Sequence, residues 1–437
     1  MSERRTSPPP WHPLAWADAL TAFGRTEMAG GAVLVVMLIA ALTWANVDPH
    51  GYVAAWAHRM ATGAEPIPPS LHTVAGALDN GLMTIFFLAV GLEIGREVAE
   101  GSLRDRRNAL LPIVAALGGM AGAALLYLVT IAVIHPRADA WRGWGIPMAT
   151  DVAFTLGAIA LLGSRVPRPL RIFVLALAVA DDIGAVVVLA VVASTRIHLW
   201  WLVGAVALLG AVALLRRRVR HSWWPYALAT LAVWYLFVRA GVEPTLAGAF
   251  VGLLVPVAGA ARAGRALEAP VHRLSSYIVL PVFVLANGGV VLTGAVWHSS
   301  GAVSMLSAII TARLVGKLLG ITLAVVLVVR LGLCGLPEET TWRHMVGISL
   351  LCGMGFTVPL LFARAVFGGS SPLYSGAQLG LLFATLGAAV LGGLILLTGR
   401  RGQSGVGARS ADPARATVPA TEGEPPAPPS DHDPKEG

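Results

Sequence analysis

Two adjacent aspartates, Asp181 and Asp182, lie inside an apolar segment that is long enough to cross a membrane. The flanking residues 172–180 and 183–189 are apolar throughout. A carboxylate at bilayer depth costs about 2.5–3.5 kcal/mol on insertion scales, and two like charges side by side oppose each other's ionisation. Carboxylate oxygens are hard ligands that suit hard cations. The pair therefore points to the movement of cations or protons across a membrane.

Two more ionisable residues, Asp151 and Lys317, lie deep in predicted membrane spans. The summed insertion cost of the four residues, about 10 kcal/mol, is hard to explain without a function. Because an α-helix has about 3.6 residues per turn, Asp181 and Asp182 point about 100° apart and cannot share all partners. One can face an ion while the other pairs with Lys317, whose ammonium can also release a proton. Three further ionisable residues are placed nearer the span ends: Asp79, Glu93 and Arg313.

The composition is that of an integral membrane protein. The chain has 437 residues, of which 56% are hydrophobic and 13% are charged, whereas soluble domains contain about 25% charged residues. Its continuous apolar runs of about 20 residues are typical of spanning helices and lack the alternation of a membrane β-barrel. The net charge of +8 is spread over short loops, so no nucleic-acid partner is expected. Two cysteines, Cys334 and Cys352, predict no disulfide framework.

The apolar runs predict an all-α protein with about twelve transmembrane helices. Their approximate ranges are 27–47, 74–95, 109–134, 145–163, 169–193, 199–215, 224–239, 242–257, 274–293, 303–329, 344–366 and 376–399. With the N-terminus inside, the inner loops hold far more arginines than the outer loops, as the positive-inside rule requires. An eleven-span alternative, which loses the weak break near Arg239–Gly241, would scramble this asymmetry. Both termini are therefore expected to be cytoplasmic.

The chain is expected to have three parts. Residues 1–26 are a polar cytoplasmic segment without the features of a removable signal peptide. Residues 27–399 form the twelve-helix domain. Residues 400–437 are rich in Pro, Ala, Gly and Ser and predict a disordered cytoplasmic tail.

The fourth and eleventh spans have sequences that predict interrupted helices. The fourth carries Pro147 shortly before Asp151, and the eleventh carries Gly353, Gly355 and Pro359 near its middle. Unwound backbone at membrane depth is tolerated where it lines a cavity, and matched interruptions in two halves mark the ion site of many transporters. Spans three to five and ten to twelve would then be inverted copies. Asp151 and Lys317 could offset the partial charges of the facing half-helix ends.

A series of short motifs runs through the chain at 86–88, 91–93, 96–97, 101–103, 149–151 with 153–154, 162–167, 177–178 with 181–185, 245–248, 316–321 and 352–357. In these motifs, in their order and at compatible spacing, the chain resembles the NhaA family of bacterial Na⁺/H⁺ antiporters. The similarity covers about 27–399, and this family is itself among the examples of transporters with matched interrupted helices.

The resemblance implies an inner-membrane antiporter whose fourth and eleventh helices cross where they are interrupted. It implies export of Na⁺ or Li⁺ in exchange for H⁺, electrogenic with two H⁺ per Na⁺, pH-regulated and without a bound cofactor. Asp181 and Asp182 would carry the ions, Thr150 and Asp151 would lie beside them, and Lys317 would pair with Asp181. A homodimer through the loop at about 48–72 is also an expectation.

The resemblance also implies a cytoplasmic cluster that tunes the pH response, with a solvated funnel rim as the alternative. Its residues are Glu93, Arg96, Glu97, Glu268 and His272. The chain departs from the family at Glu243, where a histidine is expected, and at Gly95, where a lysine is expected. Because histidine titrates near neutrality and glutamate ordinarily does not, the pH profile is expected to be displaced.

Three other functions are weighed against this one. A K⁺/H⁺ or electroneutral exchanger of the same fold is the nearest alternative. An intramembrane aspartyl protease using Asp151 and Asp181 would carry a Gly-x-Gly-Asp motif, which the sequence does not contain. A sensor or scaffold would need a larger signalling segment than the C-terminal tail. The sequence therefore favours a transporter over an enzyme.

Overall fold

A computed structural model describes residues 13–58, 71–101, 106–134, 139–192, 197–257, 262–292, 297–369 and 371–398. The chain divides into two units, Met1–Gly399 and Arg400–Gly437, and the expected disordered tail lies outside the described residues. The expected cytoplasmic segment 1–26 is described only from residue 13 onward. The described part is built from helices and contains no β-strand.

The helices follow one another along the chain with short connections. The α-helices are α1 (Pro13–Val47), α2 (Pro49–Ala57), α3 (Val74–Ala77), α4 (Met83–Ala99), α5 (Arg106–Ile134), α6 (Val152–Leu162), α7 (Arg168–Val192), α8 (Leu199–Leu215), α9 (Trp224–Ala240), α10 (Leu246–Leu254), α11 (Arg262–Leu274), α12 (Leu280–Asn287), α14 (Ser300–Thr311), α15 (Lys317–Arg330), α16 (Trp342–Leu351), α17 (Thr357–Phe367) and α18 (Pro372–Leu397). The 3₁₀ turns are η3 (Ala140–Gly145) and η4 (Gly163–Arg165), and the π turns are η2 (Leu78–Leu82), η5 (Ser275–Val279) and η6 (Ala312–Gly316).

Within the described ranges, seven helical segments are long and apolar enough to cross a membrane. They are Ala29–Val47, Val74–Ala99, Ala109–Ile134, Arg168–Val192, Arg262–Asn287, Ser300–Arg330 and Pro372–Leu397. Three of them continue through a π turn, where one extra residue widens the helix. Shorter apolar helices are α6, α8 and α17. The protein is thus an all-α membrane protein, and the count of twelve spans stays a prediction.

The predicted seventh and eighth spans are separate helices. Helix α9 ends at Ala240, and Gly241 follows with φ of 75°, a left-handed conformation that glycine adopts without strain. Helix α10 begins at Leu246 and has only nine residues, which is shorter than the predicted range 242–257. The weak break near Arg239–Gly241 is therefore a true helix end.

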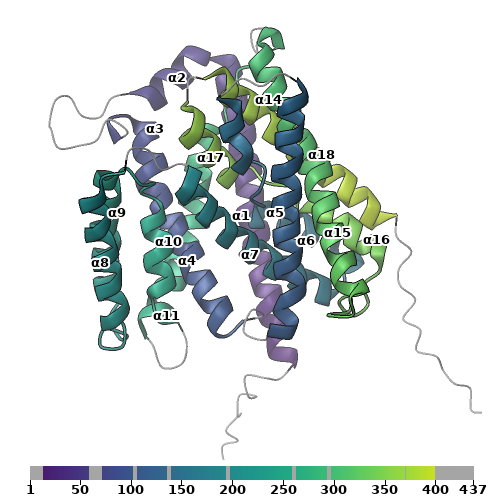
Figure 1. The fold of residues 1–437 in the computed structure, drawn as a ribbon, viewed down its shortest axis with the longest axis horizontal. Coiled ribbons are helices and arrows are strands. Elements are labelled where there is room, and N and C mark those ends of the chain that lie inside the picture. Colours follow the sequence, from purple (N-terminus) through teal and green to yellow (C-terminus); the bar gives the residue numbers. More distant parts are fainter. Residues whose placement is uncertain are drawn as a thin grey trace, which may run out of the picture. The chain divides into compact units, whose positions relative to one another are not determined.

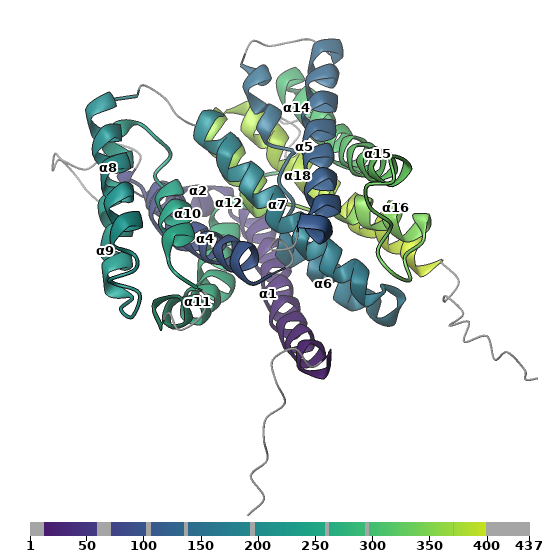
Figure 2. The same ribbon diagram turned by 60° about the horizontal axis from the view of Figure 1, so that its bottom comes forward.

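The helices gather into two groups within the first unit. Helices α4 and α8 to α11 pack together on one side, and α5, α14, α15, α16 and α18 pack together on the other, as Figures 1 and 2 both show. Helix α7 contacts α5 in the second group and α4 in the first, and α1 packs on α6 and α12. Residues carried by α7 therefore lie between the two groups.

Glycines bring the helices of each group into backbone contact. A Cβ atom on Gly122 of α5 would lie 2.4 Å from the carbonyl oxygen of Gly316, and one on Gly320 of α15 would lie 2.1 Å from that of Gly118. In α10, a Cβ on Gly248 would lie 2.1 Å from the backbone of α4. Small residues four apart allow this close approach in membrane helices. The contact with α5 fixes the start of α15, which carries Lys317.

The chain is not helical at two places that correspond to the interruptions predicted for spans four and eleven. Residues 146–151 separate η3 from α6, and residues 352–356 separate α16 from α17. Pro147 lies in the first of these segments and removes a backbone donor. Pro359 does not cause the second break, because it lies in the first turn of α17, where its missing N–H needs no partner.

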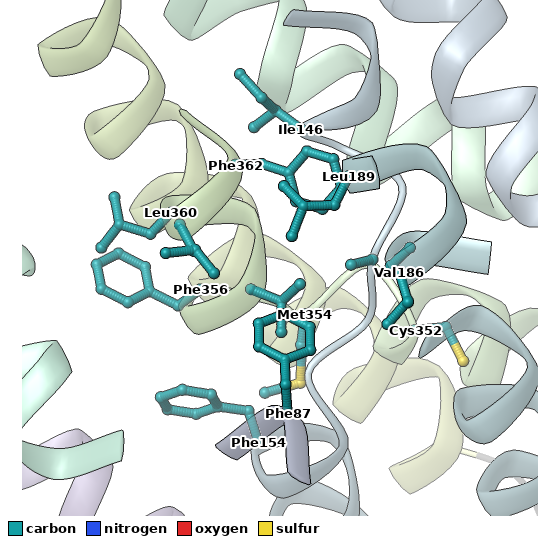
Figure 3. Close-up of a cluster of buried hydrophobic side chains, with 14 of the residues drawn as sticks. Phe87, Ile146, Phe154, Val186, Leu189, Cys352, Met354, Phe356, Leu360 and Phe362 are labelled. Carbon is teal, nitrogen blue, oxygen red and sulfur yellow. The ribbon is translucent and has the colours of Figure 1, made fainter. Parts of the chain in front are cut away.

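Buried apolar side chains enclose both interrupted segments (Figure 3). Ile146 packs near Phe362 of α17 and Leu189 of α7, while Met354 lies near Phe87 of α4 and Phe154 of α6. All six are at most 6% exposed. This shell excludes lipid and bulk water from backbone groups that have no helical partners.

Candidate ion-binding site

Asp181 is fully buried in α7 and forms an ion pair with Lys317, the first residue of α15. The Lys317 Nζ atom lies 2.5 Å from Asp181 Oδ2, and neither side chain is more than 1% exposed. Lys317 Nζ also donates to Thr150 Oγ1, which itself lies 2.5 Å from Asp181 Oδ2. The other carboxylate oxygen, Asp181 Oδ1, has no hydrogen-bond partner among the described residues. An orphaned carboxylate oxygen is costly to bury, so this atom suits a proton or a cation.

Asp182 has different surroundings, as the 100° offset between neighbours requires. It is half-buried and lines a cavity of about 60 Å³ together with Glu93, Thr150, Asp151 and Thr357. The cavity is large enough for a water-sized occupant. Of the two adjacent aspartates, one is therefore held by a lysine and the other faces an open space.

Asp151 and Thr150 connect the two interrupted segments. Asp151 Oδ2 accepts hydrogen bonds from the backbone N–H of Thr357 (3.3 Å) and from its hydroxyl (2.6 Å). The Asp151 backbone N–H donates to the carbonyl oxygen of Met354 at 3.1 Å. Thr150 Oγ1 lies 3.0 Å from the carbonyl oxygen of Cys352. Since Thr357 begins α17, the Asp151 carboxylate lies at the positive N-terminal end of that half-helix.

The carbonyl oxygens of both interrupted segments are met by Arg313 rather than by Lys317. Arg313 is 0% exposed. Its Nε donates to the carbonyl oxygen of Gly353 (2.8 Å), its Nη2 to that of Ala149 (3.1 Å) and its Nη1 to that of Pro147 (3.4 Å). The sequence suggested Lys317 as the charge beside this interrupted backbone; in the structure it is Arg313 that donates to it, from within the continuous helical segment Ser300–Arg330.

A larger cavity leads from the edge of the protein to the aspartates. It measures about 400 Å³ and is lined by Glu93, Arg96, Glu268 and His272, among others. Glu93 and His272 also line the smaller cavity beside Asp182, so the two spaces adjoin. Arg96 Nε lies 3.1 Å from Glu268 Oε1. Four of the five residues assigned to the pH response therefore lie together, whereas Glu97 is buried and does not line either cavity.

A polar cluster lies nearer the start of the helix that carries Glu93. Asp79 forms an ion pair with Arg364 of α17, and Asn287 Nδ2 donates to Asp79 Oδ1 at 2.9 Å. Gln378 Nε2 donates to the carbonyl oxygen of Asn287 at 2.7 Å. Asp79 precedes Glu93 along one continuous helix by roughly 21 Å at 1.5 Å per residue. The cluster ties helices from both groups together at that end.

Comparison with known proteins identifies the family. A family model described as Na⁺/H⁺ antiporter 1 matches residues 21–396. The Na⁺/H⁺ antiporter NhaA of Tolumonas auensis is 40% identical over 74% of this chain and 81% of its own length. The chain belongs to the NhaA family of Na⁺/H⁺ antiporters. The NhaA of Mesorhizobium japonicum is 38% identical over 85% of this chain and 92% of its own length.

A solved structure of a sodium proton antiporter is similar to this chain in fold. The sodium proton antiporter MjNhaP1 from Methanocaldococcus jannaschii matches 88% of this chain and 99% of its own with a TM-score of 0.50 at 14% identity. A likeness at this identity concerns the fold alone. Membership of the NhaA family makes the protein a multi-pass bacterial membrane transporter rather than an enzyme, and the resemblance noted in the sequence is confirmed.

Two features of this NhaA family member were not found from the sequence. One is the role of Arg313 at the interruption, for which the only signal was its spacing of four residues from Lys317, a spacing that places two side chains on one helix face. The other is the Asp79–Arg364 pair, which joins residues far apart in the chain and had no local signal. Glu243, one of the departures from the family, is buried and accepts a hydrogen bond from Thr245 Oγ1 at 3.1 Å.

Proposed function

We propose that this NhaA family member exports Na⁺ and Li⁺ across the bacterial inner membrane in exchange for protons. Asp182 binds the transported cation or a proton, while the Asp181–Lys317 pair breaks and reforms during the cycle. The exchange is electrogenic, with two protons entering for each Na⁺ that leaves, and both termini are cytoplasmic. Its pH response depends on the cluster around Arg96 and Glu268.

The proposal rests on the different surroundings of the two adjacent carboxylates, Asp181 and Asp182. Asp182 lines a cavity, so its oxygens can exchange one small cation for another. Asp181 is held 2.5 Å from Lys317 and has an orphaned oxygen. Na⁺ and H⁺ compete for the same carboxylate, because a protonated acid no longer attracts a cation. Binding of one ion therefore expels the other.

The charges around the site favour the binding of a cation. When ionised, Asp151, Asp181, Asp182 and Glu93 outnumber the two basic side chains, Arg313 and Lys317, so the ionised cluster is negative and attracts Na⁺. If Na⁺ displaces two protons, one from Asp182 and one from the Asp181–Lys317 pair, each cycle moves one net charge. The membrane potential then contributes about 2.3 kcal/mol per charge for every 100 mV.

The two ends of the site support alternating access. One end is open through the 400 Å³ cavity lined by Arg96 and Glu268, which the positive-inside rule assigns to the cytoplasm. At the other end, a cavity of about 440 Å³ is lined by Arg364 and Asn287 but by none of the three site aspartates, so the cluster of Asp79, Arg364 and Asn287 separates it from the site. A movement of one helix group against the other, around residues on α7, would open and close these ends in turn.

The experiment that tests the proposal is collapse of a pH gradient in everted vesicles from an antiporter-deficient bacterial host. Na⁺, Li⁺ or K⁺ is added at several pH values to vesicles containing the wild-type protein or Asp182→Asn. The proposal expects a response to Na⁺ and Li⁺ that is lost in the variant. Exchange of Na⁺ by Asp182→Asn would refute the role of that carboxylate, and a response to K⁺ alone would favour a K⁺/H⁺ exchanger.

Electrogenicity is tested separately in proteoliposomes with an imposed K⁺ diffusion potential and valinomycin. A potential whose polarity drives positive charge in the direction of proton movement should speed Na⁺-dependent proton movement. A potential of the opposite polarity should slow it. A rate that does not depend on the potential would indicate electroneutral exchange and would contradict the stoichiometry of two protons per Na⁺.

A further inference from the structure

We infer that Arg313 is a positioning residue that holds the two interrupted segments in register and so sets the geometry of the cation site, an inference that rests on the proposed function. Its guanidinium donates to Ala149 and Pro147 in one segment and to Gly353 in the other. These contacts span more than 160 residues of sequence and connect parts that no helix joins.

The neighbouring contacts show why this register matters for the site. Ala149, held by Arg313, is followed directly by Thr150 and Asp151, and Gly353 follows Cys352, whose carbonyl oxygen lies 3.0 Å from Thr150 Oγ1. Thr150 in turn contacts Asp181 at 2.5 Å. A displacement of either segment would therefore move the groups that surround Asp181 and Asp182.

Gly355 allows the second interrupted segment to approach Arg313 and Ala149 closely. A Cβ atom on Gly355 would lie 2.1 Å from Arg313 Nη2 and 2.9 Å from the carbonyl oxygen of Ala149. Glycine at this position thus allows the backbone to close onto the guanidinium. Arg313 itself is placed by the π turn η6, which immediately precedes Lys317.

Arg313 and Asp151 interact with opposite kinds of backbone group at the interruptions: Arg313 with carbonyl oxygens and Asp151 with an N–H group. Asp151 meets the N–H end of α17, and Arg313 meets the carbonyl groups at the other end, so each half-helix end has a charge of the right sign. Lys317 is then not needed to neutralise backbone dipoles. It is free to pair with Asp181 and to take part in proton exchange.

An arginine suits this position better than a lysine because its donors form a rigid planar fork. The guanidinium presents five N–H groups from three nitrogens and can bind two separate segments at once, whereas the lysine ammonium is a single point charge on a flexible stem. Arg313→Lys therefore keeps the charge but not the bridge. Arg313→Gln removes the charge and most of the donors.

The test compares wild type, Arg313→Lys and Arg313→Gln, with Arg330→Gln as a control that removes an exposed arginine from the same helix. Two quantities are measured on purified protein: the KM for Na⁺ against the maximal rate in proteoliposomes, and hydrogen exchange by mass spectrometry in peptides covering 146–151 and 352–356. Melting temperature reports the folded state of each variant.

For Arg313→Gln we expect faster hydrogen exchange in both peptides and a KM for Na⁺ raised about 10–100-fold, the loss found when groups that orient metal ligands are removed. Arg313→Lys should show a smaller rise in both measures, and Arg330→Gln should match wild type. If Arg313→Gln does not fold, Arg313→Lys carries the test.

Wild-type KM and wild-type exchange in Arg313→Lys, or in folded Arg313→Gln, would overturn the inference. A general rise in exchange over the whole protein with an unchanged KM would also overturn it, since that result describes a residue needed only for stability. If the wild-type protein does not exchange Na⁺, the proposed function fails, while the local hydrogen-exchange result still decides the role of Arg313.

Discussion

Removal of Lys317 should strongly destabilise the protein unless Asp181 is neutralised at the same time. The two side chains lie 2.5 Å apart and are at most 1% exposed, so Lys317→Met leaves a buried carboxylate whose remaining contact is the Thr150 hydroxyl. Breaking a buried ion pair by removing one partner costs about 3–5 kcal/mol. Asp181→Asn should cost a similar amount, because it leaves the ammonium unpaired.

The double variant Asp181→Asn with Lys317→Met should lose much less stability than the two single changes together. Replacing a buried pair as a whole is often close to neutral, so we expect a coupling of at least about 2 kcal/mol, within the range measured for residues in contact. The free energy of unfolding is measured by titration with SDS in mixed micelles.

Glu338→Gln, which changes an exposed carboxylate in a loop, serves as the control partner for Lys317→Met. That combination should be additive within about 0.5 kcal/mol. If Asp181→Asn and Lys317→Met are equally additive, the two side chains do not depend on each other, and the ion pair at the centre of the site would be refuted.

Three further substitutions test other parts of the structure. Gly320→Val should lower the free energy of unfolding by about 1–3 kcal/mol, because a Cβ there would lie 2.1 Å from the backbone of α5. Gly393→Val, where nothing lies within 4 Å of the Cβ, should unfold like wild type in the same SDS titration. Equal effects of the two changes would contradict the packing of α5 against α15. Arg364→Gln should lower the free energy of unfolding by about 1–3 kcal/mol, since Asp79 would be left buried without its cation. If this variant unfolds like the wild type, the cluster does not hold the helices together. Glu268→Gln should leave stability nearly unchanged, because its partly exposed ion pair with Arg96 contributes about 0–1 kcal/mol. It should shift the pH midpoint of exchange in vesicles, and an unchanged pH profile would show that Glu268 has no part in the pH response.

Local rules were sufficient to predict the features that depend on one helix or one segment. Helical periodicity predicted that Asp181 and Asp182 have different surroundings, and Pro147 marked the first interruption. The apolar run lengths predicted the long helices, with the exception of α10, whose nine residues are fewer than its apolar run. The helix there starts late because Pro244 precedes it, and the residue before a proline disfavours helix.

Features that depend on contacts between distant segments could not be predicted from the sequence. The partners of Arg313 are backbone carbonyl groups, which every residue possesses, so no pattern of side chains marks them. The Asp79–Arg364 pair joins η2, which continues into α4, to α17, and the sequence around either residue does not indicate the other as its partner. The second interruption was predicted in the right region, but Pro359 lies in the first turn of α17 rather than in the interruption.

The most direct test of the central claim is proton release when Na⁺ binds to the purified protein in a weakly buffered solution. The account predicts that added NaCl acidifies the solution around the wild-type protein and around Glu338→Gln, and that Asp182→Asn abolishes or sharply reduces this release, whereas added choline chloride has no effect. Equal proton release by Asp182→Asn, or Na⁺ binding without any proton release by the wild type, would contradict the claim that Na⁺ and H⁺ compete for the carboxylate of Asp182.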